Sequence, residues 1–174
     1  MNTTIENLTR AWLTCGHGEL WGCDSTYCPV PYDLLPVLSD VSPDLEWLND
    51  FPDSFWGGST LGSDENNLTH LPEIIESSRD HHVTLPAEFV RFMSDHSLQA
   101  KVPTCTACYL DLSAELIRLP WDEPSFAVRF MNDSQGCVMW YLVLKQGMPA
   151  KVVASPYFFD REIFDEMNDE DEPM

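Results

Sequence analysis

Two neighbouring segments of the chain have apolar side chains at every second position. The first segment, 126–131, has apolar side chains at Phe126, Val128 and Phe130, and the second, 138–144, has them at Val138, Trp140, Leu142 and Leu144. A polar turn, 132–136, joins the two segments. A period of two is typical of strands with one buried face. The pattern therefore predicts a pair of antiparallel strands whose apolar face needs a cover.

Apolar residues at helical spacing occur twice upstream of this strand pair. The two sets are Leu71, Ile74 and Ile75, beside Pro72, and Phe89, Phe92 and Met93, after Pro86. Side chains three and four positions apart lie on the same side of a helix, and proline is tolerated at the first helical position. The pattern predicts two amphipathic helices that begin near these prolines and cover the sheet.

Short extended segments separated by turn-forming residues fill the chain from residue 100 onward. The predicted strands are 109–112, 116–119, 126–131, 138–144 and 151–155. Strands joined by hairpin-length links predict an antiparallel meander in which sequence neighbours pair. Helices followed by strands indicate an α+β fold, with an antiparallel meander packed against helices.

The first 70 residues differ in composition from the rest because glycine and proline interrupt them repeatedly. Short helices or irregular chain are expected there, including a helix introduced by Ser42-Pro43-Asp44 and continuing to Asp50. The polar loop 63–67 is the best internal boundary. We therefore divide the chain into a Trp- and Pro-rich extension, 1–70, that packs on the core, an α+β core, 71–166, and an acidic tail, 167–174.

Composition limits the possible partners. The 174 residues are 44% hydrophobic, enough for a core of ordinary size, and 29 acidic against 9 basic residues give a formal net charge of −20. This charge disfavours phosphate backbones and anionic membranes, and it favours basic protein partners. Since no apolar run reaches membrane-spanning length and the first residues lack a secretion signal, we expect a cytoplasmic location.

The six cysteines leave three interpretations open. Cys105 and Cys108 have the two-residue spacing of half a zinc site, and Cys23 with Cys28, or Cys15 with His17, could supply the other half. The alternatives are buried thiols that act as small apolar residues, which we favour, and a redox pair. Only one pair has the tight spacing, so our interpretation is that the chain binds no metal, with zinc as the weaker alternative.

Enzymatic activity has little support in the sequence. The five histidines lie in no recognisable nucleophile or metalloenzyme motif, and no phosphate-binding loop or dinucleotide fingerprint is present. Paired carboxylates are abundant only because acidic residues are abundant, so they single out no general acid. We expect no catalytic residues and no cofactor.

Two motifs resemble the SUKH superfamily, which includes fungal cell-wall-synthesis regulators and many bacterial immunity proteins. They are the helix 85–93, which opens Leu85-Pro86, and the hairpin 126–136 that runs on into Trp140-Tyr141-Leu142. The resemblance covers about residues 71–159. The chain departs from the family pattern at 94–98, where the family commonly has a glycine-rich turn. The resemblance implies a noncatalytic domain that neutralises a toxin, frequently a nuclease or deaminase.

A toxin that grips phosphates displays lysine and arginine, so a protein that blocks it benefits from carboxylates. Asp122 and Glu123, beside Trp121, form the candidate partner-binding loop, with Trp121 as an exposed anchor. The alternative for this loop is a solvated turn with Trp121 folded back onto the sheet. The function expected is neutralisation of a basic toxin domain. The alternatives are a regulatory or scaffold protein of the same fold and a zinc-stabilised structural protein. The oligomeric state is left open.

Overall fold

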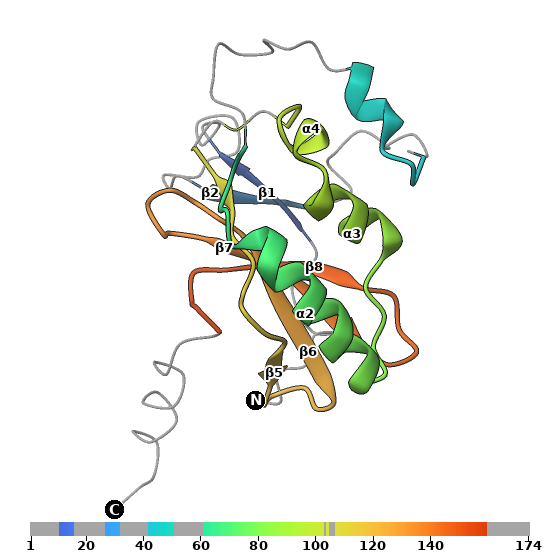
Figure 1. Ribbon diagram of the computed structural model, residues 1–174. Helices are drawn as coiled ribbons and strands as arrows, with labels where there is room; N and C mark the ends of the chain where they lie inside the picture. The colour runs from blue at the N-terminus through green and yellow to red at the C-terminus, as the bar shows by residue number, and fades with distance from the viewer. Residues whose placement is uncertain are drawn as a thin grey trace, which may run out of the picture.

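The computed structural model describes residues 11–15, 27–31, 42–50, 61–102, 104 and 107–159. Within these residues a mostly antiparallel sheet is combined with helices, which confirms the predicted α+β fold. The helices are α2 (Asn67–Asp80), α3 (Ala87–Ser94) and α4 (His96–Gln99). Figure 1 shows α2 lying over the sheet and following the direction of β6, with α3 beside it.

The main sheet of the described chain has six strands in the order β3-β4-β6-β7-β8, and β5 also pairs with β6. The strands are β3 (Gly62–Ser63), β4 (Tyr109–Leu110), β5 (Ile117–Leu119), β6 (Ser125–Asn132), β7 (Met139–Lys145) and β8 (Lys151–Ser155). The five strands predicted after residue 100 are all present. Strand β3 was not predicted, because it has only two residues; it runs parallel to β4.

Pairing in the sheet differs from a simple meander at one place. The meander holds for β6, β7 and β8, but β4 pairs with β6 and not with its sequence neighbour β5. Leu110 lies opposite Met131 near the end of β6, whereas Ile117 lies opposite Ala127 near its beginning. β4 and β5 therefore share one side of β6, because β6 is long enough to pair with both short strands.

The pairing between β6 and β7 contains an irregularity. Arg129 lies opposite Tyr141 and Met131 lies opposite Trp140, so Phe130 is one extra residue on β6. Such a bulge bends its strand and increases the local twist. Beyond it, Asp133 and Gly136, which has a φ of 69°, form the turn into β7. The predicted polar turn is thus confirmed, one residue further along.

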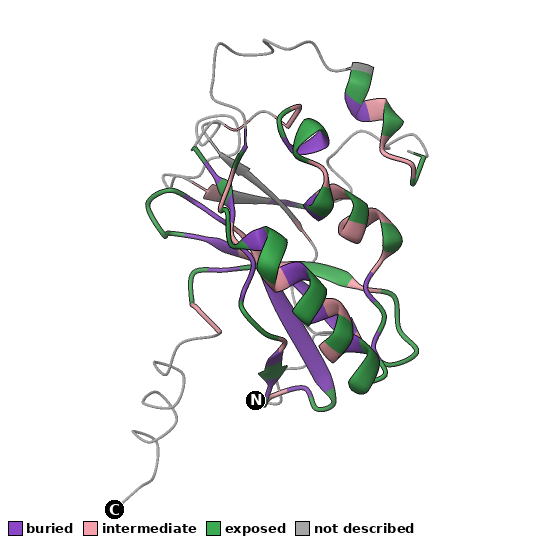
Figure 2. Cartoon of the chain, in the orientation of Figure 1, coloured by how far each residue is buried: buried purple, intermediate pink, exposed green. Residues whose placement is uncertain are grey.

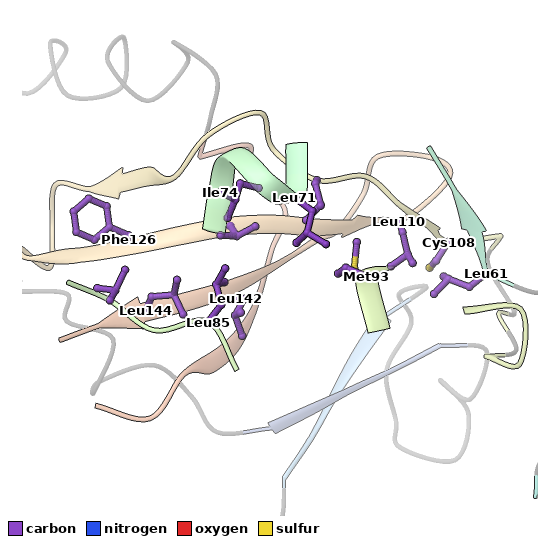
Figure 3. Packing of buried hydrophobic residues seen from close by; sticks show 13 residues of the cluster. Leu61, Leu71, Ile74, Leu85, Met93, Cys108, Leu110, Phe126, Leu142 and Leu144 are labelled. Carbon is purple, nitrogen blue, oxygen red and sulfur yellow. The ribbon is translucent and has the colours of Figure 1, made fainter. Parts of the chain in front are cut away.

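One face of the sheet packs against α2 and α3, as predicted. The core of this face is made of buried side chains from the helices, the sheet and the connecting segments, and Figure 3 shows ten of them labelled: Leu61, Leu71, Ile74, Leu85, Met93, Cys108, Leu110, Phe126, Leu142 and Leu144. Ile74 and Leu110 are fully buried. Burial of apolar area at about 25 cal/mol per Å² is the main stabilising contribution of this layer.

The opposite face of the sheet is also buried, which the expectation of a single buried face missed. Its core consists of Ile117, Leu119, Ala127, Met139, Tyr141 and Val143. Trp121, Val153, Phe158 and Phe159 pack over them. Consequently β6 is buried along most of its length, as its purple ribbon in Figure 2 shows. The residues between the alternating apolar positions are apolar as well, so a period of two alone understates the buried area.

Helix α2 begins at Asn67, so Pro72 lies inside the helix and the predicted start at Pro72 was wrong. The predicted boundary at residue 70 also falls within α2. The Asn67 side chain is buried; its Nδ2 donates to the Leu110 carbonyl at 2.9 Å, and its Oδ1 accepts from the Leu112 N–H at 2.7 Å. Asn67 thereby bonds to the β4 segment as a neighbouring strand would. Helix α3 begins directly after Pro86, as predicted.

The described parts of residues 1–70 contain the strands β1 (Ala11–Cys15) and β2 (Tyr27–Pro31), where short helices were expected. These strands form an antiparallel pair of their own. A 3-10 helix, η3 (Glu46–Asp50), starts three residues after Pro43, the first helical position predicted. Tyr27 contacts the core: its ring lies edge-on to Trp140, with 5.8 Å between ring centres.

Candidate functional site

The predicted partner-binding loop lies between β5 and β6, and its Trp121 is half-buried. The indole ring packs edge-on against Phe159 at 5.1 Å between ring centres, over the second core. This is the arrangement that the alternative interpretation described, with the tryptophan folded back onto the sheet. Trp121 therefore contributes apolar contact inside the molecule, since most aromatic area in such positions stabilises the fold.

Asp122 of the same loop is buried, and its carboxylate has two partners. Oδ2 accepts from the Ser125 hydroxyl at 2.9 Å, and Oδ1 accepts from the Lys145 ammonium at 2.9 Å. Ser125 and Lys145 are cross-strand neighbours at the ends of β6 and β7. A buried carboxylate with an ion-pair partner and a hydroxyl donor is compensated for its lost hydration. Asp122 thus ties the loop to the hairpin.

Glu123 differs from its two neighbours because its side chain is exposed. It lies 3.7 Å from the Arg118 guanidinium, and both side chains are about two-thirds accessible to solvent. An exposed pair at this distance contributes little to stability. Of the three predicted residues, Glu123 alone offers its charge to solvent. Whether a partner contacts the loop stays a prediction.

A polar cluster that the sequence analysis missed lies where β4 runs beside β6. The Arg129 guanidinium and the Asn132 amide both donate to Asp111 Oδ2, the latter at 2.7 Å. Arg129 is buried, and its guanidinium lies 5.5 Å from the centre of the Phe158 ring. Hydrogen bonds to charged groups are stronger than neutral ones. The cluster therefore joins β4, β6 and the segment after β8. Its only signal in the sequence is the single arginine within an apolar strand.

A second carboxylate, Asp133, organises the turn between β6 and β7. It is buried; Oδ2 accepts from the N–H groups of Gln135 and Cys137, both at 3.2 Å. Oδ1 accepts from the Tyr27 hydroxyl at 2.8 Å. Short polar side chains that bond to nearby backbone N–H groups are typical of turns. Asp133 therefore holds the turn and also joins it to β2.

The outward side of α2 displays acidic residues. Glu73, Glu76 and Asp80 are exposed and stand three and four positions apart, so they share one side of the helix. The helix contains one Arg, Arg79, near its end. Figure 2 shows this side of α2 as mostly exposed. The described chain thus presents negative charge on the helix that covers the first core.

Two carboxyls in turns have perturbed titration. Two hydrogen bonds from Ser97, first from its hydroxyl and then from its backbone N–H, lower the pKa of Asp95 below its ordinary value. The Glu46 backbone N–H, followed by the Ser42 hydroxyl, similarly lowers the pKa of Asp44. Both sets of hydrogen bonds favour the ionised form of the carboxyl group. Their role is to cap the short helices α4 and η3.

The residues of the weaker zinc alternative are described only in part. Cys105 and Cys23, as well as His17, lie outside the described residues, and Cys28 and Cys15 belong to β2 and β1. Cys108 is buried in the first core, 3.9 Å from the Tyr27 hydroxyl. Among the residues whose positions are described, no group of three or more His, Cys, Asp or Glu side chains is placed to hold a metal ion.

Comparison of the chain with protein-family models, with curated proteins and with solved structures found no match. In the described part of the chain, no helix is both long and apolar enough to cross a membrane. The candidate surfaces therefore rest on their own geometry.

Proposed function

We propose that this chain is a noncatalytic protein-binding module that neutralises a basic toxin domain. The observation that carries the proposal is the formal net charge of −20, part of which lies on the exposed side of α2 at Glu73, Glu76 and Asp80. Such a surface attracts a protein that displays lysine and arginine around a phosphate-binding cleft. Once bound, the acidic surface covers the phosphate-binding cleft and so prevents nucleic acid from entering it.

The distribution of the described carboxylates supports this proposal. Asp111, Asp122 and Asp133 are held by donors within the fold, and each fastens strands or turns. The acids of α2 are on a regular helix with apolar anchoring beneath, through Leu71 and Ile74. A rigid charged surface loses little conformational entropy when it binds. The α2 side is therefore the part of the described chain best suited to meet a basic partner.

The resemblance to the SUKH superfamily supports the same class of function. The residues that carry it include Leu85 and Pro86 before α3 and the β6–β7 hairpin, which here build the first core. They are fold-forming residues, so they favour a scaffold more than a particular partner. The choice of a basic toxin depends on charge.

Co-expression with a neighbouring gene for a large secreted protein tests the proposal. We expect the chain to restore growth of cells that produce the toxin domain. With purified components, suppression of toxin activity should reach its end point at one chain per toxin, since a binding module acts stoichiometrically. Continued killing despite soluble expression of both proteins would reject the pairing, and inactivation by far less than one equivalent would show catalysis.

Charge-reversal variants locate the surface. The double variant Glu73→Lys and Glu76→Lys should slow association by at least about tenfold at low salt, because steering acts on the association rate. The matched control, Glu46→Lys with Glu115→Lys, makes the same charge change at two exposed positions outside α2. Equal effects of the two variants would assign the encounter to net charge and not to α2. No effect of salt or of either variant would contradict an electrostatic encounter.

A further inference from the structure

We propose that the outer edge of β8 is a self-association site, at which two copies of this chain pair β8 with β8 in antiparallel orientation. This inference goes beyond the proposed function and does not depend on it. It rests on the exposure of β8, on the charge of the surrounding sequence and on the symmetry of the strand.

Strand β8 is the last strand of the sheet, and in the described part of the chain β7 is the only strand to which it pairs. Lys151, Val152 and Ala154 are exposed, with Val152 at 62%. Figure 2 shows β8 largely in the colour of exposed residues, in contrast to β6. An exposed apolar edge strand offers unpaired N–H and C=O groups, so it readily pairs with another strand.

Two further exposed apolar side chains flank this strand along the chain. Met148, before β8, is 46% exposed, and Tyr157, after it, is 51% exposed. Together with Val152, they make up three of the five large hydrophobic residues that are exposed in the described chain, the others being Leu68 and Tyr109. Grouping of exposed apolar residues indicates a contact surface more than scattered single residues do.

The sequence around β8 is the longest stretch of the chain without an acidic residue. It runs from Ser134 to Phe159 and contains two bases, Lys145 and Lys151. Lys145 is paired with Asp122. Two copies of a chain with a net charge of −20 repel each other at long range, so repulsion between them is weakest where carboxylates are absent. The edge is also unsuited to a basic partner, which favours a second copy as its occupant.

The strand is self-complementary when the two-fold axis passes through Val153. In that register Val152 of one copy lies opposite Ala154 of the other, and Lys151 lies opposite Ser155. No like charges face each other, and the apolar pairs contact across the strands on both faces of the sheet. The two copies of Val153 can form either a hydrogen-bonded or a non-hydrogen-bonded pair, and in both cases the outward N–H and C=O groups of one strand bond to those of the other. The result is one sheet continuing through both copies.

Sedimentation of the whole chain, from about 1 µM to about 1 mM, tests the proposal. A contact made by one short strand from each copy is small, so we expect a dimer that dissociates reversibly on dilution. We expect dimers that become stronger as salt rises, since salt screens the repulsion between like-charged copies. Val152→Lys should abolish the dimer. The control Leu68→Lys, which makes the same change at a 54% exposed site on α2, should leave it intact. A complex with a basic partner would instead weaken with salt, so the two proposals fail separately.

The register has its own test. An equimolar mixture of Val152→Lys and Ala154→Glu chains should recover the dimer, because the new lysine and glutamate face each other only in the proposed pairing. A monomeric wild-type chain at every concentration and salt would overturn the proposal. Equal loss in Val152→Lys and Leu68→Lys would overturn it too. So would amide protection of β8 that appears only when a different protein is added, since that protein would then be the occupant.

Discussion

The two edges of the main sheet differ in how far other parts of the chain cover them. At one end, β4 is covered by β3, by the Asp64 N–H, which donates to the Leu110 carbonyl at 2.9 Å, and by the buried side chain of Asn67. At the other end, β8 presents Val152 and Ala154 to solvent. One edge is closed by polar groups of the same chain, and the other is left accessible.

The difference shows what closing a sheet edge requires. The two residues of β3 are too few to cover β4 and its continuation, so the amide of Asn67 supplies one donor and one acceptor in their place. A fully buried polar side chain is needed there. At β8 the only charged residue of the strand is Lys151, which is the usual minimal protection of an edge. The closed edge should therefore be sensitive to mutation and the open one tolerant.

The largest effect is expected at Asn67. Asn67→Ala leaves the buried Leu112 N–H without its partner and removes one of the two donors to the Leu110 carbonyl, which keeps the Asp64 N–H. The free energy of unfolding should therefore fall by about 2–3 kcal/mol. Urea unfolding measures the change. Asn66→Ala is the matched control, because the Asn66 side chain is exposed and makes no capping hydrogen bond. Similar losses at the two positions would contradict the role assigned to Asn67.

A smaller effect is expected where the chain leaves β8. The Tyr141 hydroxyl donates to the Tyr157 carbonyl and accepts from the Phe159 N–H, both at 3.1 Å. Tyr141→Phe removes both bonds but keeps the ring stacked on Phe159, so unfolding free energy should fall by about 1–2 kcal/mol. Proteolysis after β8 should also become faster. Tyr109→Phe, at a more exposed tyrosine, is the control and should change both quantities less.

A still smaller effect is expected on the open edge. Val152→Ala should change unfolding free energy by no more than about 0.5 kcal/mol in dilute protein, because the side chain is mostly in solvent. Leu142, its neighbour across β7 and β8, is buried, and Leu142→Ala serves as the contrasting control. A loss at Val152 as large as that at Leu142 would show that β8 is covered, and the comparison of edges would be wrong.

The smallest effect is expected from acid. Asp95 caps α4, which contacts β3 at the closed edge. Because the pKa of Asp95 is lowered in the folded chain, its contribution is complete above the ordinary aspartate pKa and is lost as pH falls through the lowered pKa. The protection factors of the amides of 96–99, which correct for the pH dependence of intrinsic exchange, should therefore fall over that acidic range. Asp95→Asn should remove this dependence, and an unchanged pH profile in the variant would contradict the assignment.

Much of the sheet was predictable because β6 and β7 have apolar residues at every second position, which is the pattern of a strand pair with a buried face. The second buried face was not predicted, because it is built by the residues between those positions. The closed edge was not predictable, since β3 is too short to show a period and Asn67 resembles any polar loop residue. Pro72 suggested a helix start because proline is common there, yet the helix begins five residues earlier. Proline at 29 and 31 likewise concealed β2, since proline is uncommon inside strands.

The candidate site was predictable in kind more than in detail. The sequence shows that Trp121, Asp122 and Glu123 are adjacent, but their surroundings depend on residues far along the chain. Asp122 meets Lys145, and Trp121 meets Phe159, only once the hairpin and the segment after β8 are in place. Counting charged residues gives the sign of the net charge, whereas burial in the folded chain decides which carboxylates a partner can contact.

The extra residue at Phe130 determines which side chains can share one carboxylate. In a regular strand, the side chains at positions 129 and 132 point to opposite sides because the two positions are three apart, and sides alternate at each position. The bulge makes Phe130 and Met131 both face the first core, so Arg129 and Asn132 come to the same side and both reach Asp111. Deleting Phe130 would keep every polar side chain of the cluster and still place Arg129 and Asn132 on opposite sides of the strand. Chain length at this point is therefore constrained as strictly as residue identity.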